Sequence, residues 1–449
     1  MKQHLYRLSF LLAFAALTLT SATAQDTNPP AALTLTDCLN LALKQNPVLL
    51  KAQAELRRSH GLIVETRAAA LPQLTASGQY TRVDRDSIES FPGSTGPHKN
   101  QEQPWSAKIE VSQLIYSGGK VNAALRAAKL TDQIALLTYN RAVADTVLQV
   151  RKAFYDILIA QAQVTVREQS VTLLTQQLTD NRHRFEAGTV PKFNVLRAEV
   201  ELANARPPLI RAQSNLRLAR ETLVKLLAID SAPRQNNFTT LRFTGDLKTE
   251  PRQFPLDEAL QHAIAQRPEL QQAAKQVAIA GESLRVAKAG YQPTLFVFAN
   301  YGIRNTTFGE EVDQTLHGWQ VGVAGTWAIF DGFQTRGRVT QALAQQTQAE
   351  IDLADTRRTI ELEVRQACSD HLQSLELLEA QKKTVEQAEE SLRLADARFH
   401  AGTGTQLDVL SAQTALTEAR SNEIQAYYDY NVADAALERA TGASVTTKN

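Results

Sequence analysis

The chain has 449 residues, a formal net charge of +1 at pH 7 and 21% charged residues. The balanced charge and the lack of a long basic run argue against a nucleic-acid-binding protein, and two cysteines are too few to hold a disulfide framework. Aromatic residues are sparse, at 6%, while Ala, Leu and Gln are plentiful, which is typical of long helices with small interfacial residues.

Residues 1–24 predict a signal peptide for export. Lys2 and Arg7 supply positive charge, residues 8–19 form an apolar stretch, and Ala-Thr-Ala at 22–24 offers a cleavage site of small residues. The apolar stretch is too short for a confident membrane helix, and no later run reaches the roughly 18 apolar residues that a spanning helix needs. We therefore expect an exported protein that begins at Gln25, with no helical anchor and no lipid attached at that cut.

The rest of the chain is a tandem repeat. LTDCLNLALKQNP at 35–47 matches LDEALQHAIAQRP at 256–268, an offset of 221 residues. Beyond the next loop the offset becomes 214. It aligns Trp105 with Trp319 and Gly188 with Gly402, and further positions follow the same offset. Such constant offsets do not arise from composition, so we divide the chain into a first repeat at 25–235 and a second repeat at 236–449.

Both repeats predict the same elements in the same order. A short helix is followed by a second helix that begins at Pro47 or Pro268, because proline is favoured in a first helical turn. Two extended segments separated by a polar loop come next. A very long helix, a turn near residue 188 or 402 and a returning helix then complete each repeat.

The extended segments predict strand pairs at 73–83/105–117 and 294–303/318–331. WSAKIEVSQLIY at 105–116 alternates between apolar and polar residues, whereas Phe296 and Phe298 fall on the nominally polar face of their segment. A length of 10–12 residues fits a tilted strand that crosses a bilayer. Alternation alone also allows an ordinary hairpin with one solvated face.

Four aromatic residues are candidates for a girdle at a membrane surface, namely Tyr80, Trp105, Tyr301 and Trp319. Four strands cannot close a barrel alone, and open strand edges cannot face lipid, so several chains would have to combine their strands. Three chains would contribute twelve. The loops at 84–104 and 304–318 are rich in Gly, Pro, Asn and acidic residues, which predicts solvent-facing connections.

The long helices are predicted to pack as left-handed coiled coils. Residues 120–187 contain neither Pro nor Gly, and a helix of this length measures about 100 Å. Apolar residues recur at every seventh position, and this period favours left-handed supercoiling. The residues of the first series are Val150, Ile157, Val164, Val171, Leu178 and Phe185.

Some residues leave alternatives open. Cys38 and Cys368 could form a disulfide in an exported protein, and we favour two unpaired thiols on helix faces. His371 interrupts the heptad series of the second repeat, and we prefer a partly solvated interface histidine to a metal or catalytic role. Pro207 and Pro208 predict a kink in the first returning helix, to which we assign no function.

Two related segments, RFEAGTVPKFNVLRA at 184–198 and RFHAGTGTQLDVLSA at 398–412, predict the turns of two helical hairpins. Gly188 and Gly402 tolerate the backbone that reverses a helix. Asn194 and Asp408 can cap the returning helices. The apolar face of each returning helix restarts at a pair of residues, Val195 with Leu196 and Val409 with Leu410.

Together, the signal segment, the repeat, the strand-end motifs IYSGG (115–119) and IFDGF (329–333) and the two turns resemble the TolC family of outer-membrane efflux and secretion ducts. The resemblance covers essentially all of the mature chain. It implies a mainly α fold with a small membrane β-hairpin portion. It also implies a homotrimer, in which a 12-stranded β-barrel in the outer membrane continues into a 12-helix α-barrel across the periplasm.

The resemblance further implies a function and partners. Such a channel is the exit duct of a tripartite efflux pump or a type I secretion system, and it passes small molecules or proteins. Its partners are an inner-membrane transporter, a periplasmic adaptor (membrane fusion) protein that docks at the turns, and outer-membrane lipid. The adaptor-contacting residues would be Gly188, Thr189, Val195, Leu196, Gly402, Thr403, Val409 and Leu410.

The family's periplasmic entrance is commonly held shut by polar and ionic links near these turns. Asp408 matches an acidic position there, whereas Gly404, Ser411 and Asn194 stand where an Arg, a second acid and an Asp can occur. We therefore expect one ring of three Asp408 carboxylates, which would attract cations or show a raised pKa. A role for Asp408 as a helix cap alone is the equal alternative.

Two other classes of protein fit the sequence less well. A periplasmic coiled-coil adaptor or structural protein without a pore explains the signal and the hairpins, but not two strand pairs of membrane-spanning length. An exported enzyme is disfavoured because the sequence has no HExxH, GxSxG, Walker loop or Cys/His cluster. We expect no catalytic residue, cofactor or metal.

Overall fold

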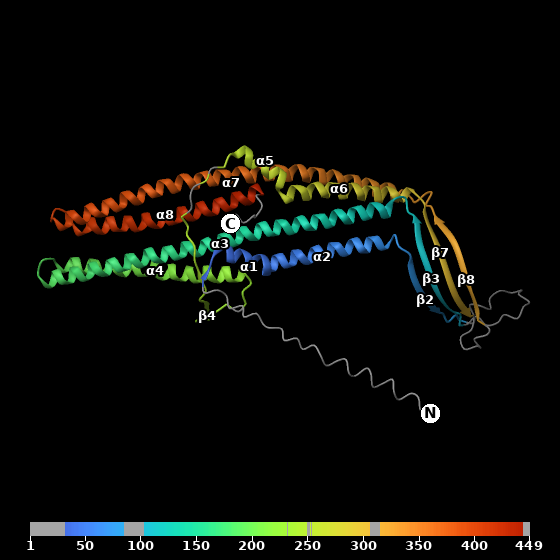
Figure 1. The fold of residues 1–449 in the computed structure, drawn as a ribbon, viewed down its shortest axis with the longest axis horizontal. Coiled ribbons are helices and arrows are strands. Elements are labelled where there is room, and N and C mark those ends of the chain that lie inside the picture. Colours follow the sequence, from blue (N-terminus) through green and yellow to red (C-terminus); the bar gives the residue numbers. More distant parts are fainter. Residues whose placement is uncertain are drawn as a thin grey trace, which may run out of the picture.

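The computed structural model describes residues 32–84, 103–230, 232–248, 252, 254–305 and 315–442. The chain is elongated, with long helices along its length and one small sheet at an end (Figure 1). The predicted signal peptide and most of both strand-connecting loops lie outside the described residues. Among the helices that are described, none is long and apolar enough to cross a membrane.

The two repeats contain matching elements. Helices α3 and α7 have 67 residues each, so each measures about 100 Å. The first repeat contains α1 (Leu35–Gln45), α2 (Pro47–Ala68), β2 (Gln73–Tyr80), β3 (Trp105–Tyr116), α3 (Lys120–Glu186) and α4 (Lys192–Leu226). The second contains α5 (Leu256–Gln266), α6 (Pro268–Lys288), the 3-10 turn η2 (Ala289–Tyr291), β7 (Thr294–Asn305), β8 (Leu316–Thr326), α7 (Gln334–His400) and α8 (Gln406–Thr441).

The sheet joins the repeats. Its order is β2-β3-β7-β8, and all neighbours are antiparallel, so β3 and β7 form the contact between the repeats while β2 and β8 are its edges. The last strand ends earlier than the sequence predicts, at Thr326 and not near residue 331. Thr294, the first residue of β7, lies opposite Thr326. Residues that follow Thr326 therefore lie beyond the end of β7 and cannot pair with it.

The sheet has one apolar and one polar face. Tyr80 lies opposite Trp105, and Ile109 lies opposite Tyr301, which in turn lies opposite Trp319, so all these side chains share one face. The same register places further apolar residues on that face, namely Leu74, Ala76, Val111, Val297, Ala299, Ile303, Val321 and Val323. The opposite face carries Lys108, Glu110, Asn300 and Gln320.

The aromatic exceptions on the polar face have a packing explanation. Phe298 lies opposite Gly322, and a Cβ placed on that glycine would come within 2.8 Å of the Phe298 ring. The glycine therefore leaves room for the ring to lie across the neighbouring strand. Phe296, whose ring centroid is 6.4 Å from that of Phe298, extends this contact toward the helices.

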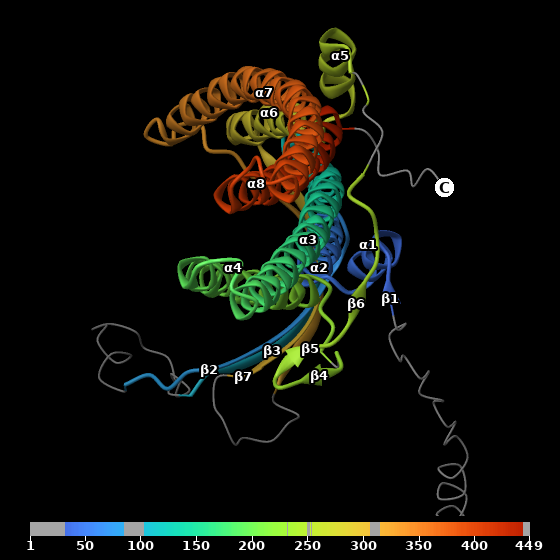
Figure 2. The same cartoon turned by 90° about the vertical axis from the view of Figure 1, so that its left-hand side faces the viewer.

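The helices form a curved single layer. Viewed along the long axis, α4, α3, α8 and α7 follow an arc, with α1 and α5 on its convex side (Figure 2). Near the sheet the order is α2, α3, α6 and α7, because α4 continues end to end into α2 and α8 into α6. The layer therefore has two free edges, with α2 and α4 on one edge and α7 on the other.

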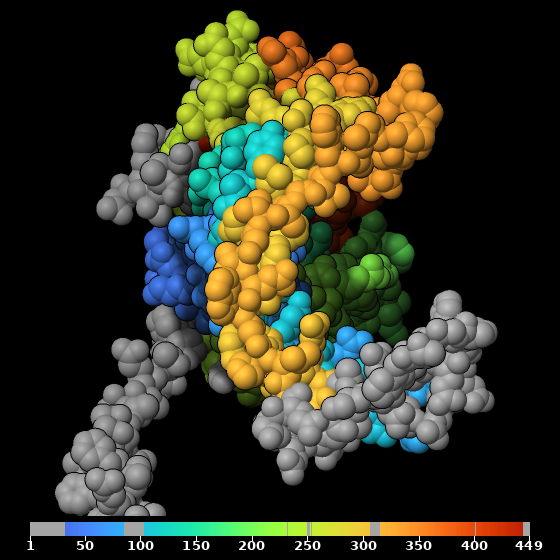
Figure 3. All heavy atoms as spheres, turned by 90° about the vertical axis from the view of Figure 1, so that its right-hand side faces the viewer, coloured from blue at the N-terminus to red at the C-terminus, as the bar shows by residue number. Residues whose placement is uncertain are grey.

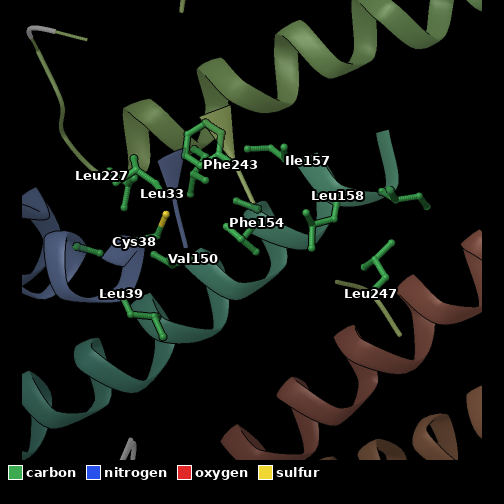
Figure 4. Close-up of a cluster of buried hydrophobic side chains, with 14 of the residues drawn as sticks. Leu33, Cys38, Leu39, Val150, Phe154, Ile157, Leu158, Leu227, Phe243 and Leu247 are labelled. Carbon is green, nitrogen blue, oxygen red and sulfur yellow. The ribbon is translucent and has the colours of Figure 1, made fainter. Parts of the chain in front are cut away.

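The main apolar core lies midway along α3, where the short elements cover it. Leu33 of β1 (Ala32–Leu33), Cys38 of α1 and Phe243 of β6 (Arg242–Phe243) surround Phe154 and Ile157 of α3 (Figure 4). Between the repeats, β4 (Arg234–Gln235) and β5 (Phe238–Thr239) form a small hairpin beside α4.

Both cysteines are free thiols, as favoured from the sequence. Cys38 is completely buried in the main core, and burial raises the pKa of its thiol to about 12. Cys368, on α7, is half-buried beside a separate small cluster of side chains from α5, α7 and α8. Neither thiol is therefore activated by its surroundings.

The expectation of a partly solvated His371 is wrong, because its side chain is buried. Its ring lies 5.6 Å from that of Phe254 and 5.2 Å from that of Tyr430, centroid to centroid, and Nε2 is 3.7 Å from a carboxylate oxygen of Asp434. Burial lowers the pKa of His371. Phe254 comes from the inter-repeat segment, so a heptad pattern within α7 could not reveal this cover.

Helix α4 continues through Pro207 and Pro208.

Candidate functional site

Both hairpin turns lie at the end of the molecule opposite the sheet, and they share one backbone geometry (Figure 1). Gly188 and Gly402 have φ angles of +73° and +75°, a region that favours glycine. A Cβ on either residue would meet nothing within 4 Å, so the backbone conformation and not crowding requires glycine. In both turns a threonine donates from its backbone nitrogen and hydroxyl to one arginine carbonyl, Thr189 to Arg184 and Thr403 to Arg398.

The turns differ in how the returning helix begins. Helix α8 begins with a capping box, in which the Asp408 nitrogen donates to the Thr405 hydroxyl at 3.2 Å while the Asp408 carboxylate accepts from the Thr405 nitrogen at 2.9 Å. Thr405 is thus the cap and Asp408 its reciprocal partner. The expectation that Asn194 caps α4 is wrong. Pro191 occupies the cap position and makes no side-chain hydrogen bond.

Asp408 is held as a carboxylate. The backbone N–H of Thr405, the hydroxyl of Thr405 and the nearby Arg398 lower the pKa of Asp408, with the backbone contribution the largest. The expected rise in pKa from crowded carboxylates has no counterpart within one chain. The local geometry instead favours a permanent negative charge at this end of the molecule at neutral pH.

A groove between α7 and α8 brings two of the gate candidates together. Its volume is about 1010 Å³, and Asp408 and Ser411 lie on its α8 side opposite Arg398 and Glu390 on α7. Gly404 lies in the adjoining turn, where a Cβ would come within 3.1 Å of the Phe399 nitrogen. Asn194 belongs to the other hairpin and does not line this groove.

The docking candidates divide into surface and core residues. The two glycines and two threonines of the turns are exposed. The side chains of Val195, Val409 and Leu410 are buried, and they pack within or between the hairpins. Leu196 matches Leu410 in the repeat alignment, yet it is 50% exposed whereas Leu410 is 6% exposed. A partner could therefore reach Leu196 and the turn residues, but not the other three side chains.

The predicted girdle residues share the apolar face but not one row. Because Ile109 lies opposite Tyr301, the Tyr301–Trp319 pair is four residues nearer the helices than Trp105, or about 13 Å along the strands. Trp319 is 78% exposed in the single chain. The sheet end presents these strands and the start of α7 at the surface (Figure 3).

A second aromatic group, which the sequence reasoning missed, lies at the helical end of the sheet. All its members are exposed, and they are Tyr116, Tyr291, Trp327, Phe330 and Phe333. Trp327 Nε1 donates to the Tyr291 carbonyl at 3.1 Å. Along β3, the eleven steps from Trp105 to Tyr116 span about 36 Å, or roughly 28 Å at a tilt of about 40°. This separation matches the thickness of a bilayer core.

The described residues contain no group of three or more His, Cys, Asp or Glu side chains that could hold a metal ion. The features that stand out are instead a two-faced sheet with open edges, two exposed turns and a charged groove. These are elements of a passage or an interface.

Comparisons with known proteins agree with that description. The outer membrane efflux protein family matches residues 38–228 and 259–443. The outer membrane protein TolC of Escherichia coli strain K12 is 26% identical over 412 residues, which cover 88% of this chain and 80% of that protein. TolC of Vibrio cholerae serotype O1 is 26% identical over 420 residues, which cover 91% and 90%. The crystal structure of the outer membrane protein VceC from Vibrio cholerae superposes with a TM-score of 0.74, at 20% identity, over 91% of this chain and 96% of that one.

Proposed function

This chain belongs to the outer membrane efflux protein family, and we propose that three copies of it assemble into a continuous duct. The protein is an outer-membrane channel that serves as the exit of an efflux or secretion system. Its sheet lies in the membrane and its helices extend into the periplasm. The alternative of a coiled-coil protein without a pore leaves the apolar sheet face unexplained.

The single observation that carries the proposal is the four-stranded sheet, which has an apolar face and two edges that pair with no other strand in the described part of the chain. Lipid cannot satisfy the backbone groups of an open strand edge, so β2 and β8 must pair with other copies. Three copies give twelve strands, with the apolar face toward lipid and Lys108, Glu110 and Gln320 toward the bore. The curved helical layer continues this wall away from the membrane (Figure 2).

The exposed turns are proposed as the site where a periplasmic adaptor protein docks, on behalf of an inner-membrane transporter. The tip of the molecule exposes small residues, which would let a partner's backbone approach closely. These residues are Gly188, Thr189, Gly402 and Thr403. Leu196 is available beside them. The duct itself performs no bond chemistry in this proposal, and the transporter supplies the energy.

Asp408 is proposed to form a ring of three carboxylates at the periplasmic entrance, with Ser411, Asn194 and Gly404 nearby in the mouth. The support is the lowered pKa of Asp408 and its place in the groove with Arg398. Such a ring would bind divalent cations, and the bound cations would block the ionic current through the channel. Replacing Asp408→Ala should relieve the block, whereas Ser411→Ala should leave it in place. An unchanged block in Asp408→Ala would eliminate the ring.

The proposed duct is tested by the mass and conductance of detergent-purified protein. We expect a particle of three chains that gives stable single channels in planar bilayers. A matched variant, Val323→Asp, places a charge on the apolar face of the edge strand β8 and should prevent insertion while leaving the helices folded. A water-soluble monomer that needs no detergent and passes no current would refute the proposal.

A further inference from the structure

The contact between the two repeats inside one chain is a template for the contact between copies. Within the chain, α3 of the first repeat packs against α6 and α8 of the second, and β3 pairs with β7. The equivalent elements at the free edges are α7 facing outward on one side and α2 with α4 on the other. Because the helices of the two repeats have the same order and lengths that differ by at most one residue, an α7 edge can meet an α2–α4 edge in the same register.

Exposure of equivalent residues shows where this contact is missing. Leu137 on α3 is half-buried in the chain, whereas its counterpart Ile351 on α7 is 61% exposed. Across the same interface, Leu410 on α8 is buried while its counterpart Leu196 on α4 is exposed. Apolar side chains that are covered at the internal contact are thus uncovered at both free edges.

The internal contact also contains defined polar partners. On the sheet side, the side-chain amide of Gln272 on α6 donates to the Thr138 hydroxyl on α3 at 3.0 Å. Nearer the middle, Glu269 lies between two arginines, with Arg439 at 2.8 Å and Arg141 at 3.6 Å. Asp145 of α3 pairs with the same two arginines, at 2.8 Å from Arg439 and 3.6 Å from Arg141, so two acids separate positive charges that approach each other from α3 and α8.

At the edges the equivalent positions carry opposite charges. The offsets of 221 and 214 place Lys51 where Gln272 stands and Asp352 where Thr138 stands. The positions of Arg439 and Arg141 become Lys225 and Asp355, a pair that attracts directly. Both bridging acids are then unnecessary, and their positions are occupied by uncharged residues, Val48 for Glu269 and Thr359 for Asp145.

The helices at the two edges carry net charges of opposite sign. Helices α2 and α4 contain 11 Lys and Arg against 5 Asp and Glu, while α7 contains 9 against 12. Lys51, Lys225, Asp352 and Asp355 are all exposed, and within the described ranges none of them forms an ion pair. Opposite charges that are left unpaired at equivalent heights fit a second copy of this chain.

We propose that copies meet with the register of the internal repeat contact, so that Lys51 and Lys225 of one copy pair with Asp352 and Asp355 of the next. In the sheet, Ile109 lies opposite Tyr301 within one chain. The equivalent residues across the seam are Val323 of one copy and Tyr80 of the next, and they should lie opposite each other in the same way. This inference rests on the proposed trimer and adds its seam. The seam is then a near-repeat of the internal interface, with six similar contacts around the duct.

The register is tested by cross-linking full-length, detergent-purified protein that carries Lys51→Cys and Asp352→Cys in a Cys368→Ser background. Cys38 is fully buried, and single-cysteine variants control for its reactivity. A short bifunctional thiol reagent should give covalent trimers on a denaturing gel, because each copy has one thiol on each edge. Thr138→Cys with Gln272→Cys should instead link within one chain, as a positive control.

A shifted pair distinguishes the register from mere proximity. Gln341→Cys lies eleven residues from Asp352, about 16 Å along α7 on the same side of the helix, and should link to Lys51→Cys at least tenfold less. Charge reversal by Lys51→Asp should lower the temperature at which trimers dissociate, and adding Asp352→Lys should restore at least half of the loss. Trimers that link better through Gln341→Cys, or no restoration by the swap, would overturn this inference alone. Failure of the unmodified protein to form trimers would instead refute the proposed duct.

Discussion

The two helical hairpins, α3–α4 and α7–α8, have the same backbone turn but different surroundings. Both turns need a glycine in the left-handed region, and both tie a threonine to an arginine carbonyl. Only the second hairpin adds a capping box. At the equivalent position that follows, the first hairpin exposes Leu196 whereas the second buries Leu410. The two repeats thus share the fold of the hairpin. The residues that differ between them reflect the different surroundings of each hairpin.

The largest difference concerns Leu410, which the second hairpin buries. Replacing Leu410→Ala should lower the free energy of unfolding by about 2–4 kcal/mol, since a large buried side chain is lost next to Leu174 and Leu178. Leu407→Ala, on the same helix but 50% exposed, should cost less than about 1 kcal/mol. Denaturant unfolding followed by circular dichroism measures both. Equal losses in the two variants would contradict the packing described for α8.

The shared feature of the turns is broken by a β-branched residue at the glycine. Gly402→Val should abolish efflux, because the φ of +75° costs a non-glycine residue roughly 1–2 kcal/mol and valine more. Gly402→Asn is the matched control, since asparagine tolerates this conformation, and it should keep most activity. Cellular accumulation of an exported dye reports efflux, and mass analysis confirms the trimer. Normal adaptor cross-linking in an inactive Gly402→Val trimer would argue against docking at this turn.

The capping box sharpens the difference between the hairpins. Thr405→Ala should destabilise the first turn of α8 by about 0.5–2 kcal/mol, because it removes the cap that accepts from the Asp408 nitrogen. Hydrogen exchange of the first amides of α8 should accelerate accordingly. The first turn of α4 has no side-chain cap, so its exchange should stay unchanged. Faster exchange at both turns would mean that the hairpins are coupled and not independently capped.

The smallest effect is a pH dependence confined to the second turn. The folded pKa of Asp408 lies below its unfolded value, so its stabilisation is present above the unfolded pKa of about 3.9 and is lost as pH falls through the folded pKa. Between pH 7 and pH 3, protection of the first turn of α8 should therefore fall, after correction for intrinsic exchange rates. Asp408→Asn should remove this dependence. A similar loss of protection in α4 would point to general acid unfolding.

Sequence reasoning was strongest where a pattern lies within one element. The glycine-free run from residue 120 predicted a helix within one residue of the observed length, and the alternation from residue 105 predicted β3 to within one residue at its end. It failed where a distant segment decides the outcome. Phe254 covers His371 from outside its helix, and the end of β7 decides where β8 stops. Leu196 and Leu410 occupy the same position of one motif, so only tertiary structure separates the exposed residue from the buried one.

The central claim, that the apolar sheet face lies in lipid, can be measured with the three tryptophans of the chain, Trp105, Trp319 and Trp327. Single-tryptophan variants in vesicles with brominated lipids report the depth of each indole by fluorescence quenching. Trp319 should be quenched most by bromines near the bilayer centre, and Trp105 and Trp327 by bromines near the headgroups. Tryptophans that all escape quenching, or that show a deep Trp327 and a shallow Trp319, would contradict the account.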